Sequence, residues 1–346
     1  MNQLIKEDAM SIANTSLNWD KLKNKSVLIS GANGYVPQFF VHGLLMRNRI
    51  YGDNIKVIAL CRNKERADKR FSEYEGRTDF ELVIGDVVEE IAYEGDIDYI
   101  IHAASPANLK TRYDNLVEVF DANVFGCKNL LEVASKKGAE VLYLSSVDVY
   151  GKMDDTKRLD EDFLGTLDIL NGRNIYACAK RAAETLCACY SSKGVVCKIV
   201  RPCQILGSGI ELDDGRLHVD FISQMLKDDE IVLKGDGTPR RTFMYVTDAI
   251  TGMLTVMLEG KSGEAYNVVC EEGEASVLEL AQTMASLVKN REIKISYNME
   301  TRKSDPAVKN VISVVCGKSD KIRALGWKAE VSLKDACERM MTYYGL

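Results

Sequence analysis

The sequence predicts an α/β protein built on a doubly wound parallel sheet, with a smaller C-terminal α/β lobe. Apolar, β-rich runs alternate with helix-like stretches through the N-terminal half, a glycine turn follows the first run, and the alternation loosens after Leu206. Continuous apolar runs are typical of strands that are buried on both faces of a parallel sheet. The expected strands are residues 26–30, 56–61, 80–84, 99–102, 141–145 and 195–200.

The stretches between these strands predict helices, most clearly over 115–137 and 176–192. Further helices are expected near 278–289 and 333–344, among loops rich in Gly and Asp. We expect an N-terminal arm over 1–24, a dinucleotide-binding domain over 25–205, and a substrate lobe over 206–346. Part of the last segment should return to the first domain. The cleft between the two domains is the expected active site.

Composition excludes several classes of function. The chain has 346 residues and a net charge of −6, which gives no general attraction to nucleic acid or to anionic membranes. No apolar run reaches the ~18 residues of a membrane span, and residues 1–18 resemble neither a signal peptide nor a transit peptide. The ten cysteines lack zinc-site spacing. We expect a cytoplasmic protein with free thiols that binds no metal, nucleic acid or membrane.

The glycine turn Gly31-Ala-Asn-Gly34 lies directly after the first strand. Gly31 permits the tight turn, and Gly34 lets the backbone approach a pyrophosphate at a helix N-terminus. Pro37 stands where a third glycine is usual, and proline is tolerated in the first helical turn. A plain strand–helix turn is the alternative, but the position after the first strand favours a bound dinucleotide.

The end of the second strand should decide which dinucleotide binds. An acid there favours NAD, whereas this chain has Arg62, and a guanidinium suits the 2′-phosphate of NADP. Arg62 therefore favours NADP, with NAD left open and a solvated basic helix start as the alternative. Asp86, after the third strand, is placed to reach the adenine edge, unless it is an ordinary turn residue.

Tyr176 and Lys180 are four residues apart on an expected helix, so they share one face. The ammonium should lower the pKa of the tyrosine by favouring the phenolate. Ser146, at the end of an apolar run, would complete a site that holds a substrate oxygen and transfers its proton. An ordinary helix face is the alternative.

The chain resembles the extended short-chain dehydrogenase/reductase family of nucleotide-sugar epimerases, dehydratases and decarboxylases, which have a Rossmann-like fold. The resemblance runs from about Lys25 to the C-terminus, with the motifs in the family's order. These motifs are Gly31-Ala-Asn-Gly34, Gly85-Asp86, His102-Ala-Ala-Ser105, Asn123-Val-Phe-Gly126, residues 145–151, Tyr176-Ala-Cys-Ala-Lys180, Arg201-Pro202, Asp214-Gly-Arg216, residues 235–248 and Ala265-Tyr-Asn-Val268.

The resemblance implies a role for each site residue. Tyr176 exchanges the proton of the sugar hydroxyl that is oxidised, usually at C4, while Lys180 holds the nicotinamide ribose and Ser146 orients the same oxygen. Arg216 and Arg241 are the expected anion contacts of the substrate, with Gln204 near the phosphates. The expected cofactor residues are Gly31, Asn33, Gly34, Tyr35, Arg62, Asp86, Val87, Ala103, Ala104, Ser105, Asn123, Tyr176 and Lys180.

The two positions after Ser146 separate the reaction types in this family. Dehydratases have an aspartate and then a glutamate there, whereas this chain has Val147 and Asp148. Valine cannot donate a proton, so the elimination lacks its acid. Decarboxylases have a glutamate at the second position, where Asp148 keeps the charge with a shorter reach. Epimerases need neither group.

The sequence therefore leaves three functions open. The first is C4 oxidation of a nucleotide sugar followed by decarboxylation or epimerisation, in the manner of the UDP-glucuronate decarboxylases that this chain resembles most. The second is an NADPH-dependent reductase of a 4-keto nucleotide sugar, or a 4,6-dehydratase. The third is a non-catalytic cofactor-binding scaffold, which the presence of Ser146, Tyr176 and Lys180 disfavours. Helices 115–137 and 176–192 are expected to form a homodimer interface.

Overall fold

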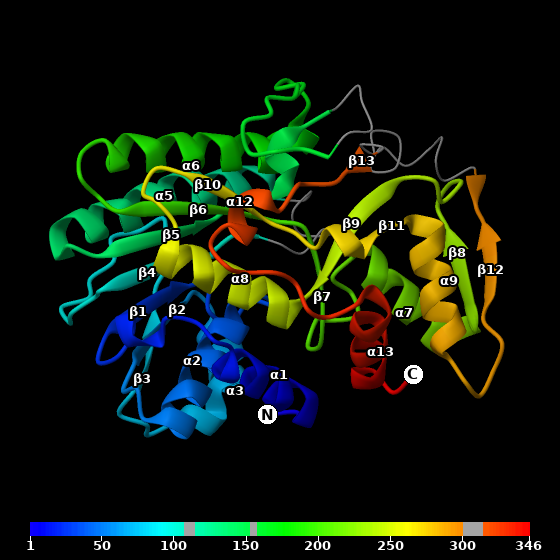
Figure 1. Ribbon diagram of the computed structural model, residues 1–346, viewed down its shortest axis with the longest axis horizontal. Coiled ribbons are helices and arrows are strands. Elements are labelled where there is room, and N and C mark those ends of the chain that lie inside the picture. The colour runs from blue at the N-terminus through cyan, green and yellow to red at the C-terminus, as the bar shows by residue number, and fades with distance from the viewer. Residues whose placement is uncertain (107–114, 153–157, 300–313) are drawn as a thin grey trace.

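The computed structural model describes residues 1–106, 115–152, 158–299 and 314–346. Its centre is a seven-stranded sheet in the order β10-β6-β5-β4-β1-β2-β3, with every pair parallel (Figure 1). The strands are β1 (Ser26–Ser30), β2 (Lys56–Cys61), β3 (Phe80–Ile84), β4 (Tyr99–His102), β5 (Glu140–Leu144), β6 (Cys197–Pro202) and β10 (Ala265–Val268). The order reverses between β1 and β4, so the predicted doubly wound sheet is confirmed.

Helices cover both faces of this sheet (Figure 1). One face carries α5 (Leu116–Lys137) and α6 (Ile175–Ser191), and the other carries α2 (Pro37–Tyr51), α3 (Lys64–Phe71) and α8 (Val246–Glu259). Successive β1 residues point to opposite faces: Leu28 lies in the core beneath α5 and α6, whereas Val27 and Ile29 lie in the core beneath α2 and α8. Burial on both faces explains why the strands are continuous apolar runs.

The C-terminal part forms smaller sheets beside the large one. β9 (Arg240–Tyr245) pairs with β7 (Gln204–Leu206), β11 (Glu274–Ser276) and β13 (Val314–Val315), and β8 (Glu230–Leu233) pairs with β12 (Lys294–Tyr297). The helices here are α7 (Leu217–Asp228), α9 (Val277–Leu287), α12 (Asp320–Arg323) and α13 (Leu333–Tyr343). α8 and β10 return to the large sheet. The division at residues 205 and 206 stays a prediction.

The helix α1 (Gln3–Asn14) packs across α2 and also contacts α8. Its Asp8 is 1% exposed and accepts hydrogen bonds from the Tyr245 hydroxyl at 2.9 Å and from Arg339 Nη2 at 2.9 Å. These contacts bring α1 beside α13, so the two ends of the chain lie close together (Figure 1). Among the described residues, no helix is both long and apolar enough to cross a membrane.

Candidate active site

The predicted site residues follow the carboxyl ends of the parallel strands. Gly31 follows β1, Asp86 follows β3, Ala103 follows β4 and Ser146 follows β5. Because parallel strands end at the same edge of a sheet, the fold gathers these residues at one edge, beside the point where the strand order reverses.

The glycine turn fits a dinucleotide. Gly31 has φ +63°, and a Cβ there would lie 2.8 Å from the Cα of Ala104. Only glycine therefore allows the turn to lie this close to the residues after β4. α2 begins at Pro37, and no side chain caps its N-terminus at Val36. Pro37 has no amide hydrogen, so the turn before α2, together with the positive end of the helix dipole, is what suits a pyrophosphate.

Ser30 and His102 hold the residues after β4, a role that the sequence did not reveal. The Ser30 hydroxyl accepts hydrogen bonds from the amides of Ala103 at 3.1 Å and Ala104 at 3.2 Å. Its own proton is then directed to His102 Nδ1, 2.8 Å away. Burial, helped by the charge of Lys180, lowers the pKa of His102 to about 3, so the imidazole is neutral. A neutral imidazole can accept the hydrogen bond from the Ser30 hydroxyl, and it places no second positive charge near Lys180.

Two of the predicted catalytic residues, Tyr176 and Lys180, lie in the first turns of α6. Lys180 is 3% exposed, and its ammonium donates a hydrogen bond to the carbonyl oxygen of Leu144 at the end of β5. The same ammonium lies 5.6 Å from the ring centroid of Tyr176 and 4.8 Å from that of Tyr143. Ser146 follows Leu144 by two residues, so a single side chain joins the helix of the tyrosine to the strand end of the serine.

A buried ion pair fixes α6 against the sheet. Arg201 at the end of β6 contacts Glu184 of α6 through Nε at 2.9 Å and Nη2 at 2.7 Å, and both side chains are 12% exposed. The Ser145 hydroxyl donates to Glu184 at 2.5 Å. Glu184 lies four residues after Lys180, and this spacing could have revealed it.

The residues that separate the reaction types differ in exposure. Val147 is 3% exposed and packs in the core, whereas Asp148 is partly exposed and its amide donates to the Ser146 hydroxyl at 3.1 Å. The guanidinium of Arg241 is near Asp148. Burial lowers the pKa of Arg241, and the negative charge of Asp148 opposes that effect. The predicted catalytic carboxylate and the predicted anion contact are therefore close enough to interact electrostatically.

Gln204 and Arg241 lie on neighbouring strands. Gln204 of β7 is directly opposite Phe243 of β9, and Arg241 is two residues before Phe243. Side chains alternate along a strand and share a face across a pair, so Gln204 and Arg241 are on the same face.

The predicted cofactor residue Arg62 is paired with carboxylates. Its Nη1 is 3.5 Å from Asp86 and 3.6 Å from Glu118 in the first turn of α5, and its side chain is 67% exposed. The structure therefore brings together Arg62 and Asp86, which the sequence assigned to two different parts of the dinucleotide. Glu118 adds a second negative charge that the sequence did not reveal.

Four further predicted cofactor residues, Asn123, Ser105, Val87 and Asn33, make contacts within the large-sheet part of the fold. Asn123 is fully buried and donates to the Ser105 hydroxyl at 3.0 Å. Val87 is 6% exposed and touches the α5 backbone at Gly126, where an added Cβ would lie 2.7 Å from the valine side chain. Asn33 donates to the carbonyl oxygen of Asn63 at 3.4 Å, which links the glycine turn to the end of β2.

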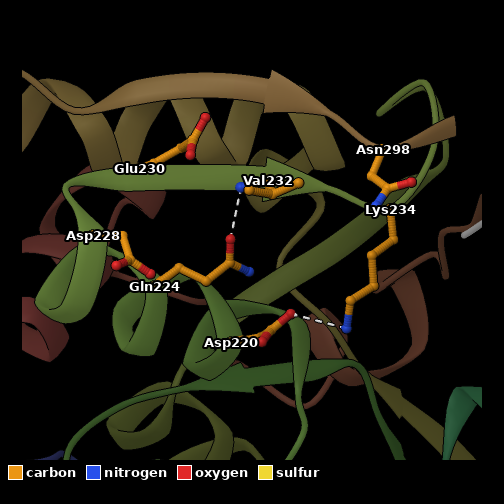
Figure 2. Close-up of a pocket in the computed structure, with 7 residues that line it drawn as sticks. All are labelled: Asp220, Gln224, Asp228, Glu230, Val232, Lys234 and Asn298. Atoms are coloured by element: carbon orange, nitrogen blue, oxygen red, sulfur yellow. Dashed lines mark hydrogen bonds and ion pairs between the residues drawn. The ribbon is translucent and has the colours of Figure 1, made fainter.

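A separate cavity of about 320 Å³ lies between α7 and β8 (Figure 2). Its lining contains none of the predicted site residues: it consists of Asp220, Gln224, Asp228, Glu230, Val232, Lys234 and Asn298. Lys234 is 3.3 Å from Asp220, and Gln224 accepts a hydrogen bond from the Val232 amide at 2.6 Å. The lining contains three carboxylates and one ammonium, so this cavity does not suit an anionic nucleotide.

Comparison with known proteins agrees with this geometry. A family model described as the NAD dependent epimerase/dehydratase family matches residues 27–269. The chain belongs to that family. UDP-glucuronic acid decarboxylase 1 of Danio rerio is 30% identical over 92% of this chain and 72% of its own length. UDP-glucuronic acid decarboxylase 5 of Arabidopsis thaliana is 31% identical over 92% of this chain and 88% of its own length.

Solved structures of epimerase/dehydratase proteins share the fold. A dTDP-glucose 4,6-dehydratase from Bacillus anthracis, in complex with NAD, has a TM-score of 0.77 at 18% identity and covers 93% of this chain and 96% of its own. A UDP-glucuronic acid 4-epimerase from Bacillus cereus has a TM-score of 0.76 at 20% identity, over 92% and 99% of the two chains. The family membership confirms the predicted Rossmann-like fold and a nicotinamide-dependent enzyme that modifies nucleotide sugars.

Proposed function

We propose that this enzyme oxidises C4 of a UDP-linked glucuronate and then removes its C6 carboxylate as carbon dioxide. The observation that carries the proposal is the arrangement of Tyr176, Lys180 and Ser146 at one strand edge, in a chain 30–31% identical to UDP-glucuronic acid decarboxylases. A bound nicotinamide dinucleotide would supply the hydride acceptor and later return the hydride.

The protein's own residues handle the proton. Tyr176, as phenolate beside the Lys180 ammonium, accepts the proton of the C4 hydroxyl while Ser146 holds the same oxygen. The hydrogen bond from Lys180 to Leu144 keeps this ammonium at the strand end, where it favours the phenolate. Tyr176 returns the proton when the 4-ketone is reduced at the end of the cycle.

Loss of carbon dioxide follows from C4 oxidation. A ketone at C4 is β to a carboxylate on C5, and such a β-keto acid breaks the C5–C6 bond to give carbon dioxide and an enolate. The enolate oxygen stays at the hydroxyls of Tyr176 and Ser146, and C5 is then protonated. Asp148 lies two residues after Ser146, which holds this oxygen. We assign the protonation of C5 to its carboxyl group.

Arg241 supports an anionic substrate at this site. Its side chain is partly buried and its guanidinium donates to the carbonyl oxygen of Arg240, and Asp148 is the carboxylate that favours its charge. A partly buried cation that is incompletely neutralised gains from an anionic ligand. We assign Arg241 to the sugar carboxylate or the diphosphate. Arg216 at the start of α7, where no side chain caps the helix, is assigned to the diphosphate.

C4 epimerisation is the second candidate, because Asp148 is shorter than the glutamate that the decarboxylase pattern has at this position. An enzyme that leaves the carboxylate in place would return hydride to the opposite face of the sugar. A 4,6-dehydratase is less supported, since Val147 packs in the core and has no proton to give.

For the cofactor we favour NAD over NADP. Arg62 suggested NADP, but its guanidinium already faces Asp86 and Glu118, and a 2′-phosphate would add negative charge beside both. The same argument disfavours a net NADPH-dependent reductase.

A homodimer through α5 and α6 is part of the proposal. α5 exposes Val117 at 73% and Phe125 at 51%, and a partner subunit on this helix would cover both apolar side chains. A cytoplasmic location is supported by the ten cysteines, all of which are free thiols.

One experiment tests the reaction. The protein is incubated with NAD and, separately, UDP-glucuronate, UDP-glucose and dTDP-glucose, and the products are identified by mass. We expect loss of carbon dioxide from UDP-glucuronate and no net formation of NADH. An isomer of unchanged mass would replace decarboxylation with epimerisation, and loss of water from dTDP-glucose would contradict both.

A further inference from the structure

Tyr35 and Arg216 are far apart in the sequence and meet in the structure. Tyr35 directly follows the glycine turn of the cofactor side, whereas Arg216 directly precedes α7 of the substrate side. The guanidinium carbon of Arg216 lies 5.4 Å from the Tyr35 ring centroid, within the range of a cation–π contact. The sequence had assigned these two residues to two different ligands.

The Tyr35 side chain is directed away from the glycine turn. Its hydroxyl is buried without a hydrogen-bond partner among the described residues, and an added Cβ at Gly207 would lie only 2.7 Å from it. The ring also meets Phe39 of α2 edge-on, with centroids 6.1 Å apart. The tyrosine therefore contributes an aromatic face here, which lies between Arg216 and Phe39.

Arg216 is held from a second side by Asp214, whose carboxylate is 3.2 Å from Nη1, and the arginine side chain is only 18% exposed. The loop before it is anchored by the Tyr344 hydroxyl, which donates to the Ile210 carbonyl oxygen at 2.5 Å. A guanidinium held between an aromatic ring and a carboxylate has few accessible rotamers, so the N–H groups that contact neither partner point in a fixed direction.

We infer that Tyr35 is a positioning residue for the substrate: its ring holds Arg216 in the orientation that binds the diphosphate of the nucleotide sugar. The inference rests on the proposed diphosphate role of Arg216. It removes the Tyr35 side chain from the cofactor contacts and leaves the backbone of the turn in that role. Substrate affinity then depends on a residue of the cofactor loop.

Equilibrium titrations with UDP and, separately, with NAD test this. Loss of a desolvated cation–π contact is expected to weaken UDP binding about 5- to 30-fold in Tyr35→Leu, with NAD affinity changed by less than about threefold. Tyr35→Phe keeps the ring and should bind UDP like the wild type. Tyr35→Met, which fills similar volume without an aromatic face, replaces Tyr35→Leu if the latter melts below the assay temperature.

A double-mutant cycle separates positioning from general damage. Arg216→Met should weaken UDP binding at least as much as Tyr35→Leu, and the double variant should be no weaker than Arg216→Met alone. Additive losses, or a loss of NAD affinity equal to that of UDP, would overturn the inference. If Arg216→Met leaves UDP binding unchanged, the proposed diphosphate role of Arg216 is what fails. If only Tyr35→Leu leaves it unchanged, the positioning role fails and the diphosphate contact stands.

Discussion

Lys180 of α6 donates a hydrogen bond from its ammonium group to the backbone carbonyl oxygen of Leu144 at the end of β5. The lysine thus joins the helix that carries Tyr176 to the strand end that precedes Ser146. Lys180→Met should lower kcat about 10²- to 10⁴-fold, because the tyrosine loses the charge that favours its phenolate. Steady-state kinetics measure this, with the exposed Lys193→Met as a control on the same chain segment. A loss below tenfold would contradict the assignment.

The buried pair of Arg201 and Glu184 predicts a large effect on stability. Arg201→Met leaves the Glu184 carboxylate buried without its cation, and the free energy of unfolding should fall by about 3–5 kcal/mol. Urea denaturation measures it. Replacing both residues, Arg201→Met with Glu184→Leu, should recover most of the loss because no charge remains buried. A double variant as unstable as Arg201→Met alone would point to packing rather than charge.

The three histidines predict acid sensitivity. Burial lowers the pKa values of His42, His102 and His218 to about 3 each. The unfolded chain binds these protons near pH 6.5 and the folded chain does not, so stability present above pH 6.5 is lost as pH falls. Asp248, with its pKa raised by burial to about 6, opposes this because its folded form binds a proton first.

The balance favours loss, by roughly 2–4 kcal/mol between pH 7 and pH 5. Urea denaturation at both pH values tests it. His218→Gln should reduce the difference by roughly 1–2 kcal/mol, since one proton is removed from the balance. Stability that is flat or rises towards pH 5 would show that these histidines titrate normally.

The carboxylates around Arg62 predict the cofactor preference. The protein should bind NAD more tightly than NADP, and Glu118→Gln should narrow the difference about threefold to tenfold by removing one negative charge near the ribose. Titration of each dinucleotide by quenching of intrinsic fluorescence measures the ratio. Glu132→Gln, further along α5, is the matched control. Tighter NADP binding by the unmodified protein would restore the preference that the sequence suggested.

Asp148 predicts how the reaction divides after C4 oxidation. Asp148→Asn should still allow transient NADH formation but release product at least tenfold more slowly, because C5 protonation loses its acid. Asp148→Glu should keep activity within about tenfold of the original, as the carboxyl group remains. Stopped-flow absorbance of NADH with product analysis distinguishes the steps. Equal product release by Asp148→Asn and the unmodified protein would exclude Asp148 from the chemistry.

The central sheet could be predicted because burial on both faces makes each strand a continuous apolar run. β6 shows the limit of this signal: residues 195–200 were expected, but the strand covers Cys197–Pro202. A charged residue such as Arg201 is not expected inside a buried strand, and it is accommodated there because it pairs with Glu184. β9 begins with two arginines and exists through pairing with strands far along the chain, so local sequence could not predict it.

The approach of Lys180 to Tyr176 could be predicted because the two residues are four apart on one helix. Contacts that depend on distant partners could not. Asp8 is buried against Tyr245 and Arg339, its hydrogen-bond partners. Both lie more than two hundred residues further along the sequence, so the burial of Asp8 could not be predicted from its neighbours. Likewise, Arg62 suggested a phosphate contact because its pairing with Glu118, a distant residue in the sequence, could not be predicted.

In the proposed reaction C4 of the sugar loses its hydride while Tyr176 takes the hydroxyl proton, and the hydride then returns to the same sugar. UDP-glucuronate carrying deuterium at C4 tests this most directly, with the product examined by mass and by NMR. We predict a decarboxylated product that keeps the deuterium at C4, slower turnover than with the unlabelled substrate, and neither outcome in Tyr176→Phe. A product without deuterium at C4, or turnover that survives Tyr176→Phe undiminished, would contradict the proposed reaction.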